Sequence, residues 1–393
     1  MVAGQQPAYA GGPLYTLLKA AHAVALARHL DQTGKPVAAL FWCASEDHDL
    51  GEADHADLIA RDGRITRLRA DLGGGSQALR HRFAAIGWEA LVAGLAAHEP
   101  AGLGQTWVRD HAPRAGETFG AWHCRLLMSL LPTLTAIEGH VLRPAWRATL
   151  RQALESWPAA ALAAHRSAHC AAGGSDPFGP LDAPPVFFDA PDGRRALSPA
   201  AARAQFELDP DQLSPGAALR PILQQAALPC THFIAGPGEL AYHALLTPLY
   251  PALGVGAPIL VQRSRATLIP AWFQRACSAR GWEPHALPAH EPAFHDNGLN
   301  ALDAALATLI ATHPELPASH ARLRRERDRL ERGLIRRRAP QRLGALRAWL
   351  RPRQQPQERV MPMLQAVWAY GPGLARLCVE HAASLPHDTF LRV

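Results

Sequence analysis

An apolar run that ends at a cluster of ionisable side chains constrains the fold of this chain more than any other feature. The run extends from Val37 to Cys43 and follows directly after Pro36. An uninterrupted apolar run of this length is typical of a strand that is buried on both faces, as in a parallel sheet. The ionisable side chains then lie at the carboxyl end of that strand, where open α/β sheets bind their ligands. The run therefore predicts an α/β fold with a functional crevice at this end of the sheet.

The cluster that follows the run is Glu46-Asp47-His48-Asp49. Three carboxylates and an imidazole this close together perturb one another, which is typical of a catalytic site. Two other interpretations stay open. Ser45 followed by acids is also typical of the start of a helix. In a helix, His48, Glu52 and His55 would share one face, which could bind zinc or iron or could simply be a hydrogen-bonded surface. We favour the surface and expect no bound metal.

The size and composition of the chain limit its class. A chain of 393 residues exceeds the usual size of a single core, so we expect a main domain with an appendage. The net charge of +6 permits anionic partners without indicating nucleic acid. The six cysteines are scattered and form no CxxC pair, which favours a reducing cytoplasm. No stretch approaches the length of a membrane span, so we expect no membrane partner.

Lysine is rare in this chain. Lys19 and Lys35 are the only lysines among the 40 basic residues. In a chain that otherwise uses arginine, a lysine indicates a place that needs a compact ammonium group. Lys19 falls in a helix predicted from Pro13 to Leu30, which follows Gly11-Gly12. The free N–H groups at such a helix start suit an anion, and Lys19 could reach the same anion. A plain glycine turn is the alternative, because neither phosphate-binding fingerprint is present.

Later segments repeat the order of strand, polar turn and helix. Thr231 to Ala235 is a predicted buried strand that leads into Gly236-Pro237-Gly238-Glu239 and a helix carrying Tyr242 and His243. Pro258 to Val261 is a further strand, and Arg263 beyond it could bind a carboxylate or phosphate, or could be a surface arginine. We expect the Gly236–Glu239 turn and the acidic turn after Cys43 to face one crevice.

Two intervening regions have other patterns. Residues Thr118 to Glu155 show a helical pattern, which is interrupted by Pro132 and Pro144. Val186-Phe187-Phe188 and the following Asp192-Gly193 predict a hairpin.

The region after about residue 300 is predicted to be helical and basic. Ala301 to Thr312 and Ala321 to Leu350 are expected helices, the second with a break at Pro340. Thirteen arginines occur between Arg322 and Arg353 against three acids. Such a helix could contact nucleic acid or could be the solvated face of a helical hairpin. We favour the hairpin, because no aromatic residue is interleaved before Trp349. A helical appendage also suits a homodimer.

The motifs described so far occur in a defined order. In these motifs and in their order, the chain resembles the bacillithiol biosynthesis cysteine-adding enzymes, the BshC family. The residues that carry the resemblance are Gly4-Gln5-Gln6, Gly12-Pro13-Leu14-Tyr15-Thr16, Lys19-Ala20, Phe41-Trp42, Glu46-Asp47-His48-Asp49, His55, Leu219-Arg220-Pro221-Ile222, Gly236-Pro237-Gly238-Glu239, Ala241-Tyr242, Arg263-Ser264 and Gln357-Glu358-Arg359.

The resemblance implies a fold and an activity. It implies a Rossmann-like parallel-sheet core with inserted segments in residues 1–299, a helical coiled-coil insertion in residues 300–353, and a tail that returns to the core in residues 354–393. Family members carry further residues before Gly4-Gln5-Gln6, so here only Met1 to Ala3 are expected to form the strand before this turn. The implied enzyme is a cytoplasmic ligase that joins L-cysteine to the amine of glucosaminyl-malate in the last step of bacillithiol synthesis. ATP with Mg²⁺ is the implied cofactor.

The positions of individual residues at strand ends suggest roles that fit this reaction. His48, flanked by Asp47 and Asp49, would be the general base for the sugar amine. One carboxylate of the cluster, which also includes Glu46, would orient the imidazole, and another could bind the cysteine ammonium. Residues expected to bind substrate or nucleotide are Gln5, Gln6, Gly12, Tyr15, Lys19, Gly236, Gly238, Glu239, Tyr242, Arg263 and Ser264. Within that set, Gly12, Tyr15 and Lys19 would hold a phosphate or the malate carboxylates, Glu239 would take a sugar hydroxyl or amine, and Arg263 would neutralise an acyl phosphate or adenylate.

Two alternative functions stay open. One is a metal-dependent hydrolase or amide-bond enzyme that uses the face of His48, Glu52 and His55. The other is a nucleic-acid-binding protein that uses the helix from Arg322 to Arg353.

Overall fold

The computed structural model describes residues 1–287, 297–338, 343–384 and 388–393. These residues form two compact units. The first unit comprises Met1–Leu58, Thr66–Ala266 and Glu358–Thr389. The second comprises Ile59–Ile65, Thr267–Gln357 and Phe390–Val393. The division into domains at residues 299/300 and 353/354 stays a prediction.

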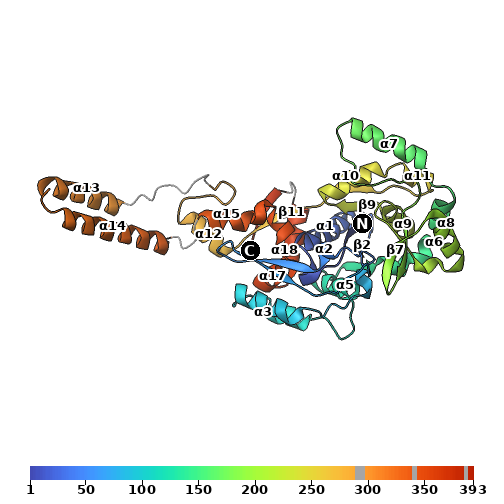
Figure 1. Cartoon of the computed structure of the whole chain (residues 1–393), viewed down its shortest axis with the longest axis horizontal. Coiled ribbons are helices and arrows are strands. Elements are labelled where there is room, and N and C mark those ends of the chain that lie inside the picture. Colours follow the sequence, from blue (N-terminus) through green and yellow to red (C-terminus); the bar gives the residue numbers. More distant parts are fainter. Residues whose placement is uncertain (288–296, 339–342, 385–387) are drawn as a thin grey trace. The chain divides into compact units, whose positions relative to one another are not determined.

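The first unit is built on a five-stranded parallel sheet, with β1 at its centre. Figure 1 labels its neighbours β2 and β9. The strand order is β10 (Ile259–Gln262), β9 (His232–Ala235), β1 (Val2–Gln5), β2 (Ala39–Cys43) and β5 (Leu134–Glu138). Val2 pairs with Leu40 of β2 on one side and with Phe233 of β9 on the other. The predicted Rossmann-like α/β fold is confirmed.

The strand β2 forms because its neighbours bury it on both edges and both faces. Phe41 and Cys43 are fully buried, and β5 pairs with β2 in parallel along its whole length. The strand β5 was not predicted, because the region from Thr118 to Glu155 has a helical pattern. The structure instead has α5 (Phe119–Leu130), then β5, then α6 (Arg143–Glu155). The segment from Leu134 is too short for the strand period to stand out between two helices.

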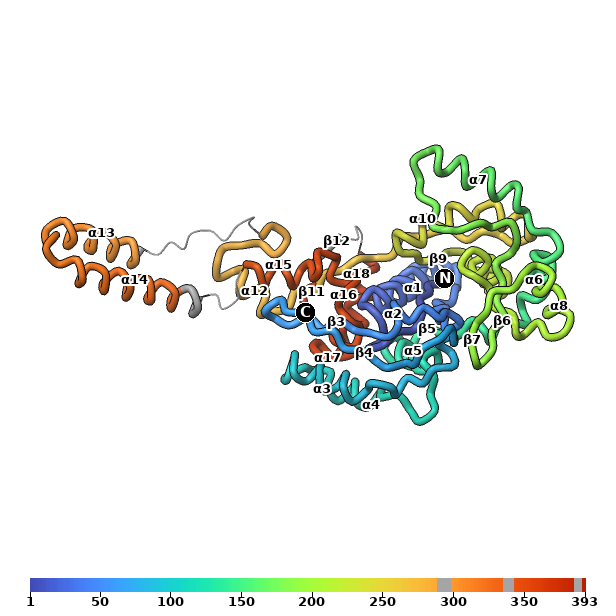
Figure 2. Tube along the Cα trace, in the orientation of Figure 1, coloured from blue at the N-terminus to red at the C-terminus, as the bar shows by residue number. Residues whose placement is uncertain are grey.

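The helix α1 (Tyr15–Gln32) is buried along most of its length and lies beside α18 (Leu374–Ala383) (Figure 2). Its alanines and leucines let it pack against β1 and β2 as well as against α18. The C-terminal segment also covers the start of this helix, since the Leu14 N–H donates to the Met361 carbonyl at 2.8 Å. The helix start is therefore part of the core.

An antiparallel insertion precedes β9. It consists of β6 (Val186–Ala190), β7 (Gly193–Ala196) and β8 (Leu213–Pro215) in the order β7-β6-β8. The predicted hairpin is confirmed as β6 and β7. The pairing of β8 with β6 has no clear sequence signal, because Ser214-Pro215 carries no strand pattern.

The remaining elements of the first unit connect these parts. Their bounds are η1 (Tyr9–Gly11), α2 (Leu50–Ala53), β3 (His55–Ile59), β4 (Ile65–Arg69), η2 (Leu79–His81), α3 (Trp88–His98), α4 (Gln105–Asp110), η3 (Gly139–Leu142), α7 (Ala159–Ala171), α8 (Pro199–Leu208), η4 (Pro210–Gln212), α9 (Arg220–Ala227), α10 (Pro237–Leu245), α11 (Leu249–Ala252), α16 (Gln357–Val360) and α17 (Met363–Tyr370). The strands β3 and β4, which reach the segment Ile59–Ile65, form a sheet of two.

The second unit is mainly helical. Its elements are α12 (Ala271–Ser278), α13 (Asn297–Thr312), α14 (Pro317–Arg338), α15 (Leu343–Leu350) and η5 (Pro352–Gln354), and β11 (Arg265–Ile269) pairs with β12 (Asp388–Arg392). The helices α13 and α14 form a hairpin (Figure 1). The predicted break at Pro340 lies outside the described residues.

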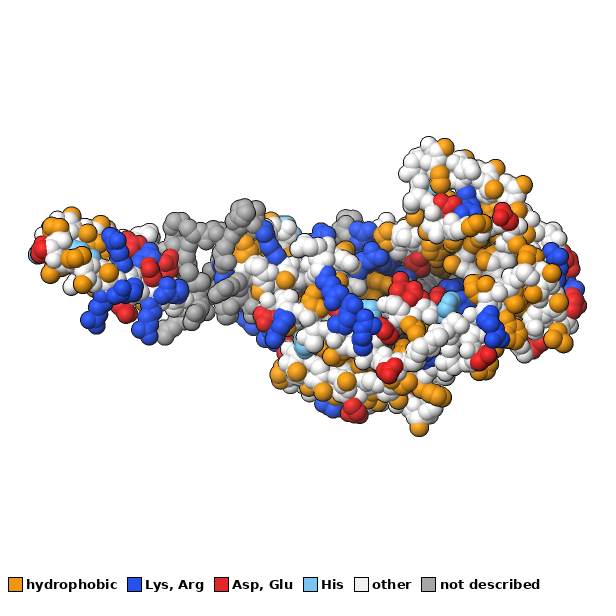
Figure 3. Space-filling view, viewed as in Figure 1, with side chains coloured by type: hydrophobic (Ala, Val, Ile, Leu, Met, Phe, Trp, Pro, Cys, Tyr) orange, Lys and Arg blue, Asp and Glu red, His pale blue; other side chains and the backbone are white. Residues whose placement is uncertain are grey.

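Arginine side chains project from α14 (Figure 3), and some of their charge is neutralised within the hairpin. The Arg327 guanidinium donates to both oxygens of Asp303 at 2.7 Å and to Glu331 at 2.5 Å. These contacts favour the solvated face of a hairpin over a nucleic-acid surface.

The close packing of α4 against α17 generates a stability prediction. A Cβ on Gly104 would lie 1.9 Å from the Val367 carbonyl oxygen, whereas a Cβ on Gly373 would meet nothing within 4 Å. We expect Gly104→Ala to lower the free energy of unfolding by about 3 kcal/mol, because backbone must move to admit the methyl group. Gly373→Ala, at a helical φ of −58°, should change it by less than about 1 kcal/mol. Urea unfolding of both variants measures the difference, and equal midpoints would contradict this packing.

Candidate functional site

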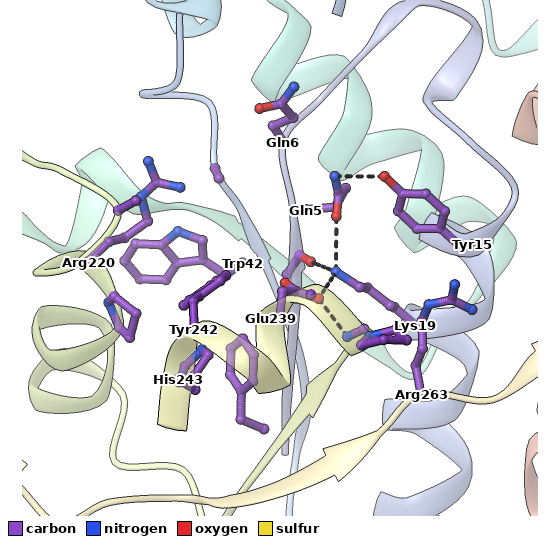
Figure 4. A pocket seen from close by; sticks show the side chains of 18 of the residues that line it. Gln5, Gln6, Tyr15, Lys19, Trp42, Arg220, Glu239, Tyr242, His243 and Arg263 are labelled. Carbon is purple, nitrogen blue, oxygen red and sulfur yellow. Dashed lines mark hydrogen bonds and ion pairs between the residues drawn. The ribbon is translucent and has the colours of Figure 1, made fainter. Parts of the chain in front are cut away.

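A pocket of about 460 Å³ opens at the carboxyl ends of the parallel strands (Figure 4). Its walls come from residues that end or follow β1, β2, β9 and β10, with further contributions from α1, α9 and α10. This is the edge of an open α/β sheet where ligands bind. The residues that line the pocket are Gly4, Gln5, Gln6, Tyr15, Lys19, Trp42, Ala44, Glu52, Pro177, Ala217, Arg220, Pro221, Gln224, Phe233, Gly236, Pro237, Gly238, Glu239, Tyr242, His243, Arg263 and Arg359.

The structure brings together most of the residues predicted to bind substrate or nucleotide. Those that line the pocket are Gln5, Gln6, Tyr15, Lys19, Gly236, Gly238, Glu239, Tyr242 and Arg263. Gly12, Ser264 and the predicted catalytic residues Glu46, Asp47, His48 and Asp49 do not line it. Their predicted roles stay predictions, and their positions are described below.

Lys19 is a buried bridge between three segments. Its ammonium donates to the Gly4 carbonyl at 2.8 Å and to Gln5 Oε1 at 3.0 Å, and it forms an ion pair with Glu239 Oε2 at 2.5 Å. Burial lowers the pKa of Lys19, and the charge of Glu239 opposes that shift. An ammonium group has three N–H donors, and protein acceptors take up all of them. Lys19 therefore shapes the pocket wall and has no donor left for the predicted anion.

Glu239 fixes the start of α10. Its Oε2 accepts from the Gly236 N–H at 2.7 Å in addition to its ion pair with Lys19. Gly238 has open space where a Cβ would lie, so a ligand can approach the backbone there. Figure 4 shows Glu239 and Lys19 pointing toward each other at the base of the pocket.

Arg263 is a buried side chain with defined partners. Its guanidinium forms an ion pair with Glu358 Oε1 at 2.7 Å, donates to the Ser264 carbonyl at 3.0 Å and stacks on the Tyr15 ring at 5.1 Å. The Ser264 hydroxyl is buried away from the pocket and has no hydrogen-bond partner among the described residues. Arg263 thus lines the pocket with its charge already balanced by Glu358.

Gly12 belongs to the packing of the helix start. It has a φ of +75°, and its carbonyl accepts from the Met363 N–H at 2.8 Å. The helix start predicted to hold an anion is thereby covered by residues 361–363. No pocket-lining atom comes from Gly12.

Carboxylates in the turn after β2 form ion pairs with arginines. Glu46 Oε1 accepts from Arg143 Nε at 2.9 Å, and Arg143 also pairs with the buried carboxylate of Asp189. Arg80 donates to the same Asp189 at 2.8 Å. These contacts join the end of β2 to the antiparallel insertion, so Glu46 is a structural ion pair here.

Asp47 connects this turn to the pocket. Its Oδ1 accepts from the backbone of His48 at 2.8 Å and of Asp49 at 3.3 Å, and its Oδ2 pairs with Arg220 at 3.3 Å. Burial acts to raise the pKa of Asp47, but the charges of Arg220 and Arg194 and the two N–H groups outweigh it, so its pKa lies below the usual value. Asp47 is therefore ionised and holds Arg220 against the pocket wall.

The proposed metal-binding face does not exist. The helix α2 has only four residues, and His55 begins the strand β3 beside Asp54, whose Oδ1 lies 3.0 Å from His55 Nδ1. The interpretation of His48, Glu52 and His55 as one helical face is wrong, because the chain turns into a strand after one helical turn. Within the described ranges, no group of three or more His, Cys, Asp or Glu side chains could hold a metal ion.

Sequence reasoning assigned no role to several residues that line the pocket. Arg220 and Arg359 bring cationic groups to it, Trp42 and Phe233 bring aromatic side chains, and His243 brings an imidazole. Burial lowers the pKa of His243 to about 4, so its ring is neutral. The motifs Leu219-Arg220-Pro221-Ile222 and Gln357-Glu358-Arg359 contained the signal for the two arginines. None of the helices in the described part of the chain is long and apolar enough to cross a membrane.

Comparison with known proteins identifies the family. The family model for the N-terminal Rossmann-like domain of bacillithiol biosynthesis BshC matches residues 1–135 and 188–264, which carry four of the five sheet strands and most of the pocket. The chain belongs to the BshC family. The matched segments exclude residues 136–187, where α6 and α7 lie.

Curated relatives agree with this assignment, and each is named "Putative cysteine ligase BshC". The relative from Koribacter versatilis is 32% identical over 68% of this chain and 54% of its own length. A relative from Thermus thermophilus is 29% identical over 96% of this chain and 85% of its own length. The chain thus spans about half the length of the first BshC relative and most of the second.

The two lysines provide a matched test of the Lys19 bridge. We expect Lys19→Met to lower the free energy of unfolding by about 2–3 kcal/mol, because it leaves the Glu239 carboxylate without its cation. The expected loss of stability is smaller than for a fully buried ion pair, because the Glu239 side chain is 22% exposed. Lys35→Met, in an exposed turn, should change it by less than about 0.5 kcal/mol. Urea unfolding compares the two, and equal stability would exclude a bridging role for Lys19.

Proposed function

We propose that this protein is a ligase that joins the carboxyl group of L-cysteine to the amine of glucosaminyl-malate, with ATP as the activating co-substrate. Membership of the BshC family supports the reaction class. The observation that carries the proposal is that the family's motifs line one pocket. These motifs lie on β1, α1 and α10 and directly after β9 and β10.

The cationic side of the pocket suits the anionic parts of these substrates. Arg220 pairs with one carboxylate in the described structure, that of Asp47, through Nη2. Its other N–H groups, together with Arg359 and the N–H groups at the start of α10, can bind a carboxylate of malate or a phosphate. This proposal moves the anion-binding role from Lys19 to Arg220.

The other walls suit the sugar and the amine. Trp42 and Tyr242 (Figure 4) offer aromatic faces against which a sugar ring can pack, and Phe233 also lines the pocket. Glu52 and Glu239 are the carboxylates that line the pocket, and a carboxylate is the natural partner of an amine or ammonium group.

ATP, when bound, would supply the phosphoryl or adenylyl group that activates the cysteine carboxylate. The start of α10 and Arg220 fit such an anionic group. A magnesium ion would take most of its ligands from phosphates and water. A cytoplasmic location and a homodimer through the α13–α14 hairpin remain parts of the same proposal.

Product formation tests the proposed function. Purified protein is incubated with L-cysteine, ATP, Mg²⁺ and glucosaminyl-malate, and the condensed thiol is measured by mass spectrometry. We expect product, and we expect Arg220→Ala to lower kcat/KM by about 10- to 100-fold, the cost of one or two charge-assisted hydrogen bonds.

The control variant is Arg147→Ala, which removes a half-exposed ion pair with Asp211. It should leave kcat/KM unchanged. Folded wild-type protein that forms no product under these conditions would contradict the proposed function.

A further inference from the structure

Arg194 is held rigidly beside the imidazole of His48. Its Nε donates to Ser214 Oγ at 2.8 Å, its Nη2 donates to the Pro215 carbonyl at 2.7 Å, and its guanidinium lies 3.9 Å from the centre of the Phe187 ring. These contacts leave Nη1 directed at His48 Nδ1, 3.3 Å away. The same Phe187 ring lies beside His48.

This contact determines which ring nitrogen of His48 carries the proton. A guanidinium can only donate hydrogen bonds, so His48 Nδ1 must be the acceptor. The proton of the neutral ring then sits on Nε2, and Nε2 can only donate. Neither nitrogen is available to take a proton from a substrate amine. His48 therefore has no free lone pair with which to act as the predicted general base.

His243 also lines the pocket, but burial lowers its pKa to about 4 and makes it a weak base, so the lining carboxylates are the remaining candidates. Glu239 is unsuitable, because its Oε2 is shared between the buried Lys19 ammonium and the Gly236 N–H. Protonation of Glu239 would leave that ammonium without its counter-charge. The lining tyrosines are unsuitable too, because burial raises the pKa of Tyr15 to about 12 and that of Tyr242 further still.

Glu52 has the properties that a base requires. It lies on the short helix α2, its side chain is exposed, and its Oε2 accepts from Gln6 Nε2 at 3.2 Å. The charged or titratable groups that face it are Asp47, Asp49, Tyr15 and Arg359. Partial burial and then the charges of Asp49 and Asp47 raise its pKa, and Arg359 opposes the shift. A carboxylate with a raised pKa is a more effective base near neutral pH.

We propose that Glu52 is the general base of the ligation and that His48, which lies outside the pocket lining, is held by Arg194 as a positioning residue with its Nε2–H as a hydrogen-bond donor. This inference rests on the proposed function. The amine of the glucosamine gives one proton to the Glu52 carboxylate as its lone pair attacks the activated cysteine carbonyl. The C–N bond forms, and the phosphate or nucleotide leaves with the electron pair of the broken C–O bond.

Kinetics of matched Glu→Gln variants test the role of Glu52. Glu52→Gln keeps the shape and an acceptor for Gln6 but cannot take a proton. We expect kcat to fall by about 100-fold or more, while KM for cysteine stays within about threefold. Glu207→Gln, which alters an exposed ion pair with Arg151, should keep the wild-type rate. Formate should restore part of the activity of Glu52→Ala, a rescue that a structural role would not give.

The outcomes separate the two proposals. Product formed by Glu52→Gln at the wild-type rate overturns the role of Glu52 alone. Absence of product from folded wild-type protein overturns the proposed function and the role of Glu52 with it.

Nitrogen-15 NMR of histidine-labelled protein tests the His48 assignment without turnover. His48→Gln identifies the resonances by their loss. We expect a neutral ring with the proton on Nε2 in the wild type, and a mixture of tautomers in Arg194→Met. A proton on Nδ1 in the wild type would overturn the donor role, and so would a loss of kcat in His48→Gln greater than in Glu52→Gln.

Discussion

The buried ammonium of Lys19 is the interaction on which the arrangement of the first unit depends. It lies on α1, it binds the carbonyl at the end of the central strand β1, and it neutralises Glu239 at the start of α10. A charge buried this deeply is tolerated only with complete partners. Because those partners come from β1 and from α10, which follows the neighbouring strand β9, the contact that satisfies the charge also ties the start of α10 to the end of the central strand.

The acidic turn after β2 joins structural elements and also positions an arginine that lines the pocket. Glu46 holds Arg143 through Oε1, and Arg143 connects β2 to the antiparallel insertion through Asp189. Asp47 is turned the other way and positions Arg220 at the pocket. Neighbouring acids thus have different roles, because Glu46 pairs with Arg143 and Asp47 pairs with Arg220. The clustering of acids in the sequence indicated that this turn is important, but it did not predict the partner of each acid.

The sequence predicted the fold better than the chemistry of the site. The apolar run of β2 and the turn after β9 identified the sheet and its crevice, because burial and backbone geometry leave a periodic signal. The strand β5 was missed, since five residues between two helices give no clear period. The partners of Lys19 could not be predicted either, because Glu239 reaches it only through the pairing of β1 with β9. The metal face failed for a local reason, the early end of α2 at Ala53.

The pairing of β1 with β9 has a consequence for how the protein is made. Val2 must pair with Phe233, and the chain between them includes the sheet strands β2 and β5 and the whole antiparallel insertion. Contacts so distant in sequence form late and slowly. Until they form, the central strand has one bare edge, and the pocket, which needs both strands, does not exist. Any small molecule that occupies the pocket therefore binds only the folded protein. By mass action, such binding raises the free energy of unfolding as the concentration of the small molecule rises.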